Sequence, residues 1–289
     1  MMPKHILVTG ANGQLGNEMR NILASDNGAV PYFTDVNELD ITSREAIESF
    51  LDEHRVDYLV NCAAFTAVDK AENNVELCTK LNAQAVQLLA EAAHKHGAKM
   101  VQVSTDYVFD GENCRPYRED DPTCPVSVYG RTKLEGEKRL FAAAPESVVL
   151  RTAWLYSPYG HNFVKTMINL GKTKPALKVV VDQLGTPTYA KDLAGAIMTV
   201  INAPEWHSGI YHYSDEGAIS WYDFTKAIHR LAGITTCQVN ACMSEEYPTP
   251  AHRPHYSVLD KSKFKQTFGA TIPYWEDSLK DCIERLNQE

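Results

Sequence analysis

The stretch that decides the fold is Lys4-His-Ile-Leu-Val-Thr9, followed directly by Gly10-Ala-Asn-Gly13-Gln-Leu-Gly16. A strand-like apolar run, a glycine turn and a helical pattern from Asn17 to Ala24 succeed one another. Three glycines so placed allow a tight turn, close approach of the backbone to a diphosphate, and close helix–strand packing. The amino end of the helix would offer free N–H groups to that anion. Three glycines alone also fit a structural turn, but their place at a strand-to-helix junction favours dinucleotide binding.

The alternation of strands and helices continues beyond this turn. Strands are predicted at residues 29–34, 58–61, 99–104, 147–152 and 209–214, and helices at 43–54, 75–96 and around Tyr129. Thr42 and Glu45 indicate a cap for the helix at 43–54. This pattern predicts an α/β fold built on a Rossmann-type, doubly wound parallel sheet.

The rhythm weakens after about Tyr156, where prolines and aromatic residues accumulate. We therefore expect a smaller C-terminal substrate domain assembled from separated segments. The dinucleotide-binding Rossmann domain is predicted to comprise residues 1–155 with about 189–216. The substrate domain is predicted to comprise about 156–188 with 217–289.

Composition limits the classes of partner. The 289 residues carry a formal net charge of -9, with 44% hydrophobic and 22% charged residues. No basic stripe offsets that charge, so a nucleic-acid surface is not expected. No apolar run approaches the ~18 residues of a membrane span, and the opening apolar stretch is too short for a signal peptide. We expect a cytoplasmic protein without a membrane partner.

The seven cysteines are an odd number and include no Cys-x-x-Cys pair. This pattern favours reduced thiols over a disulfide framework or a zinc site. His94 and His96 point in different directions on a helix, and the pair at His252 and His255 encloses a proline. No metal site is expected.

A candidate proton-transfer device lies at Tyr129-Gly-Arg-Thr-Lys133. On a helix, residues four apart share a face, so the Lys133 ammonium can lie beside the Tyr129 phenol. A neighbouring positive charge favours the phenolate, which would lower the tyrosine pKa from its ordinary ~10 towards neutrality. Thr105, at the carboxyl end of the strand at 99–104, would hold the same substrate oxygen with its hydroxyl.

The segment Tyr222-Asp-Phe-Thr-Lys226 repeats this spacing. For a single match the ordinary interpretation is an amphipathic helix face. Tyr222 has no buried strand before it, and residues 219–231 read as a capped amphipathic helix with aromatic residues in a core. We therefore assign the chemistry to Tyr129 and Lys133.

Two further positions favour a bound nucleotide. Asp35 lies about 20 residues beyond Gly16, the spacing of the acidic residue that binds an adenosine ribose, although a turn aspartate is also compatible. The run Asn61-Cys-Ala-Ala64 has small side chains where a cofactor could lie against the backbone. Asn82 is interpreted as a surface amide.

These motifs together resemble the extended short-chain dehydrogenase/reductases. Within that group the chain is similar to the dTDP-4-dehydrorhamnose reductase family. The resemblance rests on ELDIT (38–42), NCAAFTAVDKAE (61–72), STDYVFDG (104–111), VYGRTKLEGE (128–137), RTAWLY (151–156), DQLGTPTYAKDLA (182–194) and YPTPAHRP (247–254).

The resemblance implies hydride transfer from NADPH, with NADH also accepted, to the C4 ketone of dTDP-4-dehydro-L-rhamnose, a small-molecule sugar nucleotide. Tyr129 would give the proton, Lys133 would lower the tyrosine pKa and bind the nicotinamide ribose, and Thr105 would orient the carbonyl. The substrate-binding set it implies is Thr66, Val68, Thr105, Asp106, Tyr107, Trp154 and Arg253, with Arg253 on the diphosphate. The cofactor-binding set, from the glycine turn and the matched motifs, is Gly10, Asn12, Gly13, Gln14, Leu15, Gly16, Asp35, Asp40, Ile41, Cys62, Ala63, Ala64, Tyr129 and Lys133.

Two other functions stay open from the sequence. One is a regulatory subunit similar to the β subunit of methionine adenosyltransferase, which binds a partner without reducing a sugar. The other is an epimerase or dehydratase that recycles its bound cofactor.

The oligomeric state is predicted from a position at which this chain differs from some relatives. Some relatives share magnesium across a dimer through glutamates, and Glu18 matches one such position, but Lys191 replaces another. A cation at a carboxylate ligand position removes a donor and repels the ion. We expect no metal, a direct pair between Lys191 and an acidic neighbour, and a monomer or weak homodimer.

Overall fold

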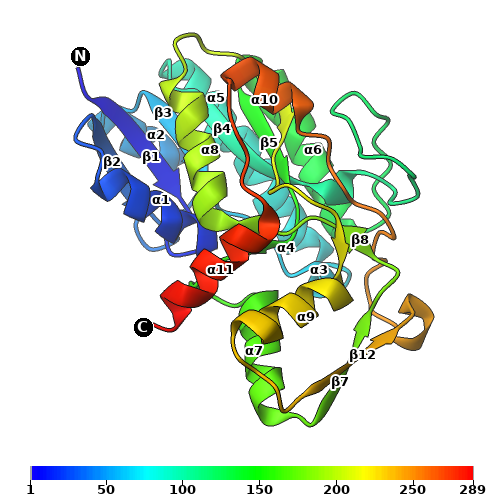
Figure 1. Ribbon diagram of the computed structural model, residues 1–289. Helices are drawn as coiled ribbons and strands as arrows, with labels where there is room; N and C mark the ends of the chain where they lie inside the picture. Colours follow the sequence, from blue (N-terminus) through cyan, green and yellow to red (C-terminus); the bar gives the residue numbers. More distant parts are fainter. Residues whose placement is uncertain (1, 289) are drawn as a thin grey trace.

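A six-stranded parallel sheet organises the computed structural model, which describes residues 2–288 (Figure 1). Its order is β10-β5-β4-β3-β1-β2. The strands are β1 (Lys4–Thr9), β2 (Ala29–Thr34), β3 (Tyr58–Asn61), β4 (Lys99–Thr105), β5 (Val148–Thr152) and β10 (Gly209–His212). After β1 the chain adds β2 on one side and β3 on the other, so the strand order reverses between β1 and β3. In open parallel sheets, ligands bind at such a switch point, beyond the carboxyl ends of the strands. The predicted fold class is confirmed.

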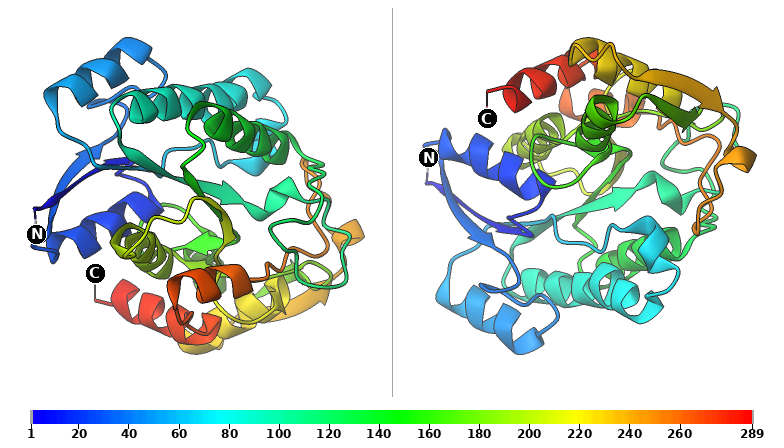
Figure 2. Two further views of the ribbon diagram at one scale, coloured as in Figure 1. Left: turned by 90° about the horizontal axis from the view of Figure 1, so that it is seen from above. Right: turned by 90° about the horizontal axis from the view of Figure 1, so that it is seen from below.

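Helices cover both faces of this sheet, as the two views in Figure 2 show. Successive residues of a strand point to opposite faces, so Ile6 and Val8 enter one core and Leu7 enters the other. The first core is closed by α1 (Gln14–Ala24) and α8 (Ala190–Asn202), which contribute buried leucine, isoleucine and methionine side chains. The second is closed by α2 (Arg44–Glu53), α5 (Ala85–Lys95) and α6 (Val128–Ala143).

A smaller core lies beside the sheet, around Phe224 and Leu279. It is formed by α7 (Phe163–Thr173), α9 (Trp221–Leu231) and α11 (Trp275–Leu286), with the parallel pair β7 (Ala176–Val180) and β12 (Gln238–Cys242) next to them. Two further short ladders are separate from the six-stranded sheet. They pair β6 (Leu155–Tyr156) with β9 (Thr188–Tyr189), and β8 (Leu184–Gly185) with β11 (Ile219–Ser220).

The proposed division into two domains assigned all of 217–289 to the smaller part. The helix α10 (Ser262–Phe268) nevertheless packs Phe264 into the larger core, against Tyr211 and Tyr213. The domain boundaries therefore stay a proposal, with α10 grouped with the sheet.

Two local predictions were wrong. The single helix expected at 75–96 is divided into α4 (Val75–Thr79), a π-helical turn at Lys80–Gln84, and α5; α3 (Val68–Ala71) precedes them. The cap of α2 is Ser43, whose side chain accepts a hydrogen bond from the Ala46 amide, and not Thr42.

All seven cysteines are free thiols, as predicted. Within residues 2–288, no helix combines the length and the apolar character needed to cross a bilayer.

Candidate active site

The three predicted catalytic residues line one cavity of about 510 Å³ at the carboxyl end of the sheet. Thr105 ends β4, and Tyr129 and Lys133 lie one turn apart on α6. The Ser127 side chain caps α6 at the Gly130 amide. A Cβ at Gly130 would lie 2.1 Å from the Tyr107 carbonyl oxygen, so glycine lets α6 approach the turn after β4 closely.

The predicted lowering of the Tyr129 pKa is not found. Burial raises the pKa of Tyr129 above its ordinary value, and the Thr105 hydroxyl offsets only part of this rise. Lys133 donates to the Val103 carbonyl at 2.6 Å, and burial lowers its own pKa to about 8. Tyr129 is therefore a neutral phenol at pH 7, the form that can donate a proton to a developing alkoxide.

Asp106 supplies a buried carboxylate to the same cavity. Its Oδ1 accepts a hydrogen bond from Thr105 at 2.9 Å, while its Oδ2 has no partner among the described residues. Burial raises the pKa of Asp106 to about 6. A buried acceptor without a partner in a ligand cavity is suited to a substrate hydroxyl.

Tyr107 and Arg253 lie on the wall of the cavity and contact each other. Arg253 donates to the Tyr107 hydroxyl at 3.0 Å and pairs with Asp69 at 2.8 Å. The Tyr107 and Tyr129 rings meet edge to face, with centroids 5.5 Å apart. Asp69, which holds Arg253 in place, was not identified from the sequence because the two are far apart along the chain.

The glycine turn forms the floor between β1 and α1. A Cβ at Gly10 would lie 2.7 Å from the Ala63 nitrogen, and one at Gly16 would lie 2.4 Å from the Gly10 oxygen. No side chain caps α1, which begins at Gln14, so its first N–H groups stay available. The turn therefore fits a dinucleotide diphosphate, with backbone where a side chain would obstruct it.

A second cavity of about 340 Å³ continues from this turn and shares Gly13 and residues 62–64 with the first. Asp35, Asp40 and Ile41 line it, as expected of an adenosine end. The Asp35 carboxylate accepts hydrogen bonds from the Asn12 and Val36 amides at 3.0 and 2.9 Å. Asp35 therefore has two roles: its carboxylate holds the glycine turn, and its side chain lines the second cavity.

The structure brings most of the predicted site residues to these two cavities. Exceptions are Gly16, which is enclosed by the turn, and Asn12, which is exposed; neither lines a cavity. Thr66, Val68, Trp154, Gln14 and Leu15 all line the larger one.

Asn82 is buried, so its interpretation as a surface amide was wrong. It lies in the π-helical turn and exchanges two hydrogen bonds with the backbone of Phe65, at 2.8 and 3.1 Å. Its amide also contacts the Thr132 hydroxyl on α6 at 3.2 Å. Asn82 therefore ties the loop carrying Thr66 to the helix carrying Tyr129, and a π-helical turn is typical of such sites.

Other cavity residues were missed by the sequence analysis, among them the segment 160–162 and Trp221. Asn162 donates to the Gln14 side chain at 3.0 Å and so holds that segment over the glycine turn. Trp154 has φ 48°, a strained conformation that costs a non-glycine residue about 1–3 kcal/mol. Nothing in the local sequence indicated the Asn162 contact or the Trp154 conformation.

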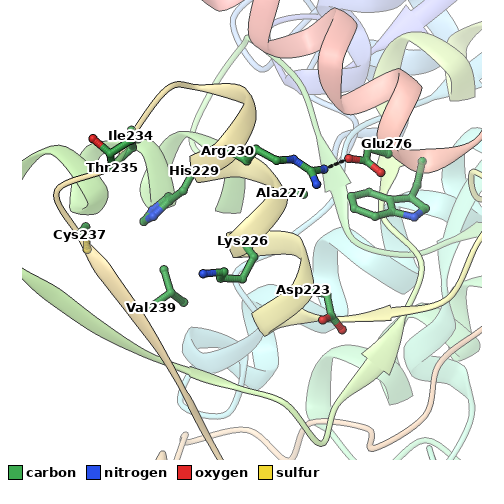
Figure 3. A pocket seen from close by; sticks show the side chains of 11 residues that line it. Asp223, Lys226, Ala227, His229, Arg230, Ile234, Thr235, Cys237, Val239 and Glu276 are labelled. Carbon is green, nitrogen blue, oxygen red and sulfur yellow. Dashed lines mark hydrogen bonds and ion pairs between the residues drawn. The ribbon is translucent and has the colours of Figure 1, made fainter.

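A separate cavity of about 600 Å³ lies between α9, β12 and the start of α11 (Figure 3). Asp223, Lys226 and His229 line it, and Arg230 pairs with Glu276 beside it. It is larger than the 510 Å³ cavity but contains none of the predicted site residues. We therefore place the chemistry in the cavity that contains Tyr129.

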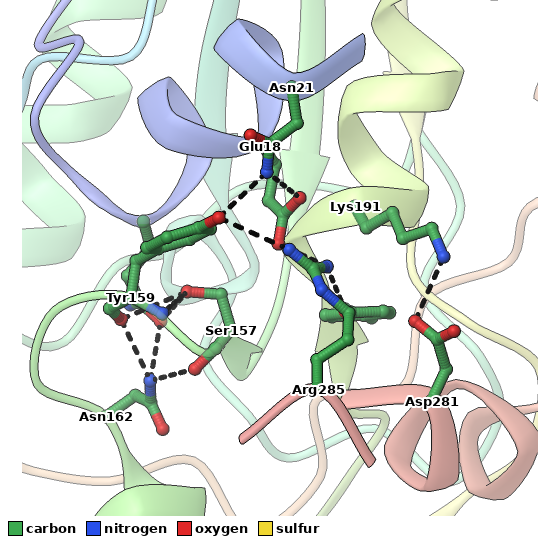
Figure 4. Close-up of polar contacts among 10 residues, drawn as sticks. Glu18, Asn21, Ser157, Tyr159, Asn162, Lys191, Asp281 and Arg285 are labelled. Carbon is green, nitrogen blue, oxygen red and sulfur yellow. Dashed lines mark hydrogen bonds and ion pairs between the residues drawn. The ribbon is translucent and has the colours of Figure 1, made fainter. Parts of the chain in front are cut away.

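Glu18, on α1, is buried and pairs with Arg285 on α11 at 2.8 Å (Figure 4). Lys191 pairs with Asp281 at 3.0 Å, which confirms the predicted acidic neighbour. Among residues 2–288, no group of three or more His, Cys, Asp or Glu side chains could hold a metal ion. Independence from metal stays a prediction.

A family model and a curated protein both match nearly the whole chain. Residues 4–288 match the model of the RmlD substrate binding domain family. A dTDP-4-dehydrorhamnose reductase of Aggregatibacter actinomycetemcomitans is 42% identical, over 96% of this chain and 97% of its own.

Solved structures show the same likeness. The crystal structure of a dTDP-4-dehydrorhamnose reductase from Clostridium acetobutylicum is 48% identical, with a TM-score of 0.94 over 98% of this chain and 99% of that one. The enzyme of that name from Bacillus anthracis, in complex with NADP, is 36% identical, with a TM-score of 0.93 over 98% and 100% of the two chains.

Proposed function

Because the chain belongs to the RmlD substrate binding domain family, we propose that it is an NADPH-dependent dTDP-4-dehydrorhamnose reductase. It reduces the C4 ketone of dTDP-4-dehydro-L-rhamnose to the alcohol of dTDP-L-rhamnose. The substrate is thus a small sugar nucleotide.

The observation that carries this function is the convergence of Thr105, Tyr129 and Lys133 on one cavity. Gly13, directly before α1, lines both that cavity and the second cavity, which lies past the carboxyl end of β2. A nucleotide lying on the glycine turn would therefore bring its reactive end to the three side chains.

We assign the chemical steps to these residues as follows. NADPH supplies the hydride when it is bound. Tyr129 donates its hydroxyl proton to the oxygen of the reduced carbonyl, Thr105 holds that oxygen by a hydrogen bond, and the Lys133 ammonium stabilises the phenolate left behind.

The other predicted residues are assigned contacts with the substrate and the cofactor. Asp106 accepts a hydroxyl of the sugar at its free oxygen, and Arg253, held by Tyr107 and Asp69, binds the diphosphate. Asp35 limits affinity for a 2′-phosphate without preventing it, so NADPH is the main donor and NADH a second one.

The test is to incubate the protein with NADPH and dTDP-4-dehydro-L-rhamnose, and to measure cofactor consumption together with dTDP-L-rhamnose formation. One cofactor should be oxidised per product formed. A regulatory subunit would consume none, and an epimerase or dehydratase would convert a sugar without net oxidation of the cofactor.

We also propose a cytoplasmic monomer or weak homodimer. The Glu18 carboxylate is already paired with Arg285, and Lys191 with Asp281, which supports assembly without a shared ion. Gel filtration over a range of protein concentrations, with and without magnesium, tests this proposal.

A further inference from the structure

The segment 157–162 joins β6 to α7 and contains no helix or strand. Its last three residues line the cavity together with Gly13 and Gln14. We call residues 157–162 the strap. Connecting segments of this kind open more readily than helices and strands do, so side-chain contacts decide where the strap lies.

Both ends of the strap are tied to Gln14, the first residue of α1. The Asn162 amide donates to the Gln14 side-chain oxygen at 3.0 Å, and the Ser157 hydroxyl donates to the same oxygen at 3.3 Å. Between them, a Cβ on Gly160 would lie 3.4 Å from the Gln14 Cγ atom. The strap backbone therefore lies close to the residue that directly follows the glycine turn.

Tyr159 ties the middle of the strap to α1 and α11 (Figure 4). Asn21 donates to the Tyr159 hydroxyl at 2.9 Å, and Arg285 donates to it at 3.4 Å. Arg285 also donates to Glu18 at 2.8 Å and to the Tyr189 hydroxyl. One guanidinium thus joins the strap to α1 and to α11, because its several N–H groups point in different directions.

Glu18 holds Arg285 in this position. The Glu18 side chain is only 1% exposed, and a buried carboxylate depends on its partner cation. The pair between Lys191 and Asp281, also on α11, is exposed by comparison. Glu18, Tyr159 and Arg285 are not among the residues that line the cavity. An effect of Arg285 on a ligand in the cavity must therefore act through the strap.

We propose that Arg285 is a positioning residue for the cofactor. Its contacts with Glu18 and Tyr159 form a latch that keeps the strap against the glycine turn, where the cofactor diphosphate binds. This inference rests on the proposed function for the identity of the cofactor, NADPH. Without the latch the strap is closed for only part of the time, and the apparent affinity falls by that fraction.

The binding test titrates the free protein with NADPH and follows nicotinamide fluorescence, with no sugar nucleotide present. For Arg285→Met we expect Kd for NADPH to rise about 3- to 10-fold, the range expected for one lost hydrogen-bonded contact. Lys191→Met breaks another ion pair of α11 and should match the parent. An unchanged Kd in Arg285→Met overturns the proposal, as does an equal rise in Lys191→Met.

A double-mutant cycle separates the latch from a general loss of structure. Tyr159→Phe removes the hydroxyl that Asn21 and Arg285 contact, so its Kd for NADPH should rise as much as that of Arg285→Met. The double variant should show no further rise, because both changes break the same latch. Additive effects overturn the proposal. If Arg285→Met does not fold, an unchanged Kd in Tyr159→Phe overturns it alone.

Hydrogen exchange tests whether the strap itself is released. In the free protein, amides of residues 157–162 should exchange faster in Arg285→Met than in the parent and in Lys191→Met, and saturating NADP⁺ should restore their protection. Equal exchange in the parent and Arg285→Met overturns the latch, as does faster exchange spread over the whole chain. Latch-dependent NADPH binding without reduction of the sugar nucleotide instead overturns the assigned reaction.

Discussion

Two helices of this molecule carry the same Tyr-x-x-x-Lys spacing, and only their surroundings distinguish them. On α6, Lys133 is buried and bonded to the Val103 carbonyl of β4. On α9, Lys226 is exposed and lines a cavity away from the sheet. The spacing brings two side chains to one helix face in both cases. The carboxyl end of a buried strand, with Thr105 and Asp106, is what makes one of them a candidate active site.

The largest effect is expected when the proton donor is removed. Tyr129→Phe should lower kcat by about 10²- to 10⁴-fold with little change in NADPH affinity, because only a hydroxyl is lost. Tyr222→Phe should stay within about twofold of the parent, as expected for a residue outside the chemistry. Steady-state kinetics and cofactor titration measure both, and equal losses in the two variants would refute the assignment.

The lysine pair gives the next largest contrast. Lys133→Met should lower kcat/KM by roughly 10²-fold and weaken NADPH binding, because the charge that stabilises the phenolate is lost. Lys226→Met removes an exposed charge and should leave both quantities close to the parent values. If Lys226→Met were as damaging, burial on α6 would not be the deciding difference.

The pH profile sharpens the contrast through Asp106. Burial raises its pKa to about 6, so the carboxylate is ionised above that pH and neutral below it. Substrate kcat/KM should therefore fall about tenfold per pH unit as pH decreases below ~6, because the better acceptor form is lost. Asp106→Asn should flatten this acidic limb, whereas Tyr222→Phe should retain it. An unaltered limb in Asp106→Asn would assign it to another group.

The residue before each lysine is a threonine, which allows a matched test of stability. Thr132 bonds to the Tyr129 carbonyl and contacts Asn82 and Cys78, whereas the Thr225 hydroxyl bonds only to the Trp221 carbonyl. Thr132→Val should lower the free energy of unfolding by about 1–3 kcal/mol, because a buried amide loses a partner. Thr225→Val should cost less than about 1 kcal/mol. Urea unfolding compares them, and equal costs would show that the α6 network contributes no extra stability.

The smallest expected effect is that of a chelator. Glu18, paired with Arg285, offers no free carboxylate for a shared ion. EDTA should alter neither kcat nor the elution volume in gel filtration, for the parent and for Tyr222→Phe alike. Loss of both dimer and turnover on chelation would show that a metal is required.

Elements governed by local pattern were predictable from the sequence. The strand at Lys4–Thr9, the glycine turn and the face shared by Tyr129 and Lys133 depend on residues close together in the chain. Thr105 was placed correctly, at the carboxyl end of β4, because the residues before it form an apolar run that predicts a buried strand.

Features created by long-range packing were not predictable. Asn82 reads as an ordinary helical amide, and only the approach of Gly136 on α6, whose added Cβ would lie 2.1 Å from the Asn82 oxygen, shows why it is buried. The contact between Trp154 and Trp221 joins residues from separate parts of the chain. The raised pKa of Tyr129 follows from the desolvation imposed by the side chains packed around it, which no spacing reveals.

The late position of β10 in the chain has a consequence for synthesis. β10 pairs with β5, so the nascent sheet keeps an open edge at β5 until residues 209–212 have left the ribosome. At ~5–20 residues per second, the roughly 60 intervening residues take on the order of 3–12 s. An unpaired strand edge is a template for wrong pairing during that interval. Ribosome-stalled chains that end before β10 should therefore be cleaved by protease faster than chains that extend past it, and equal cleavage would show that β5 is protected by other means.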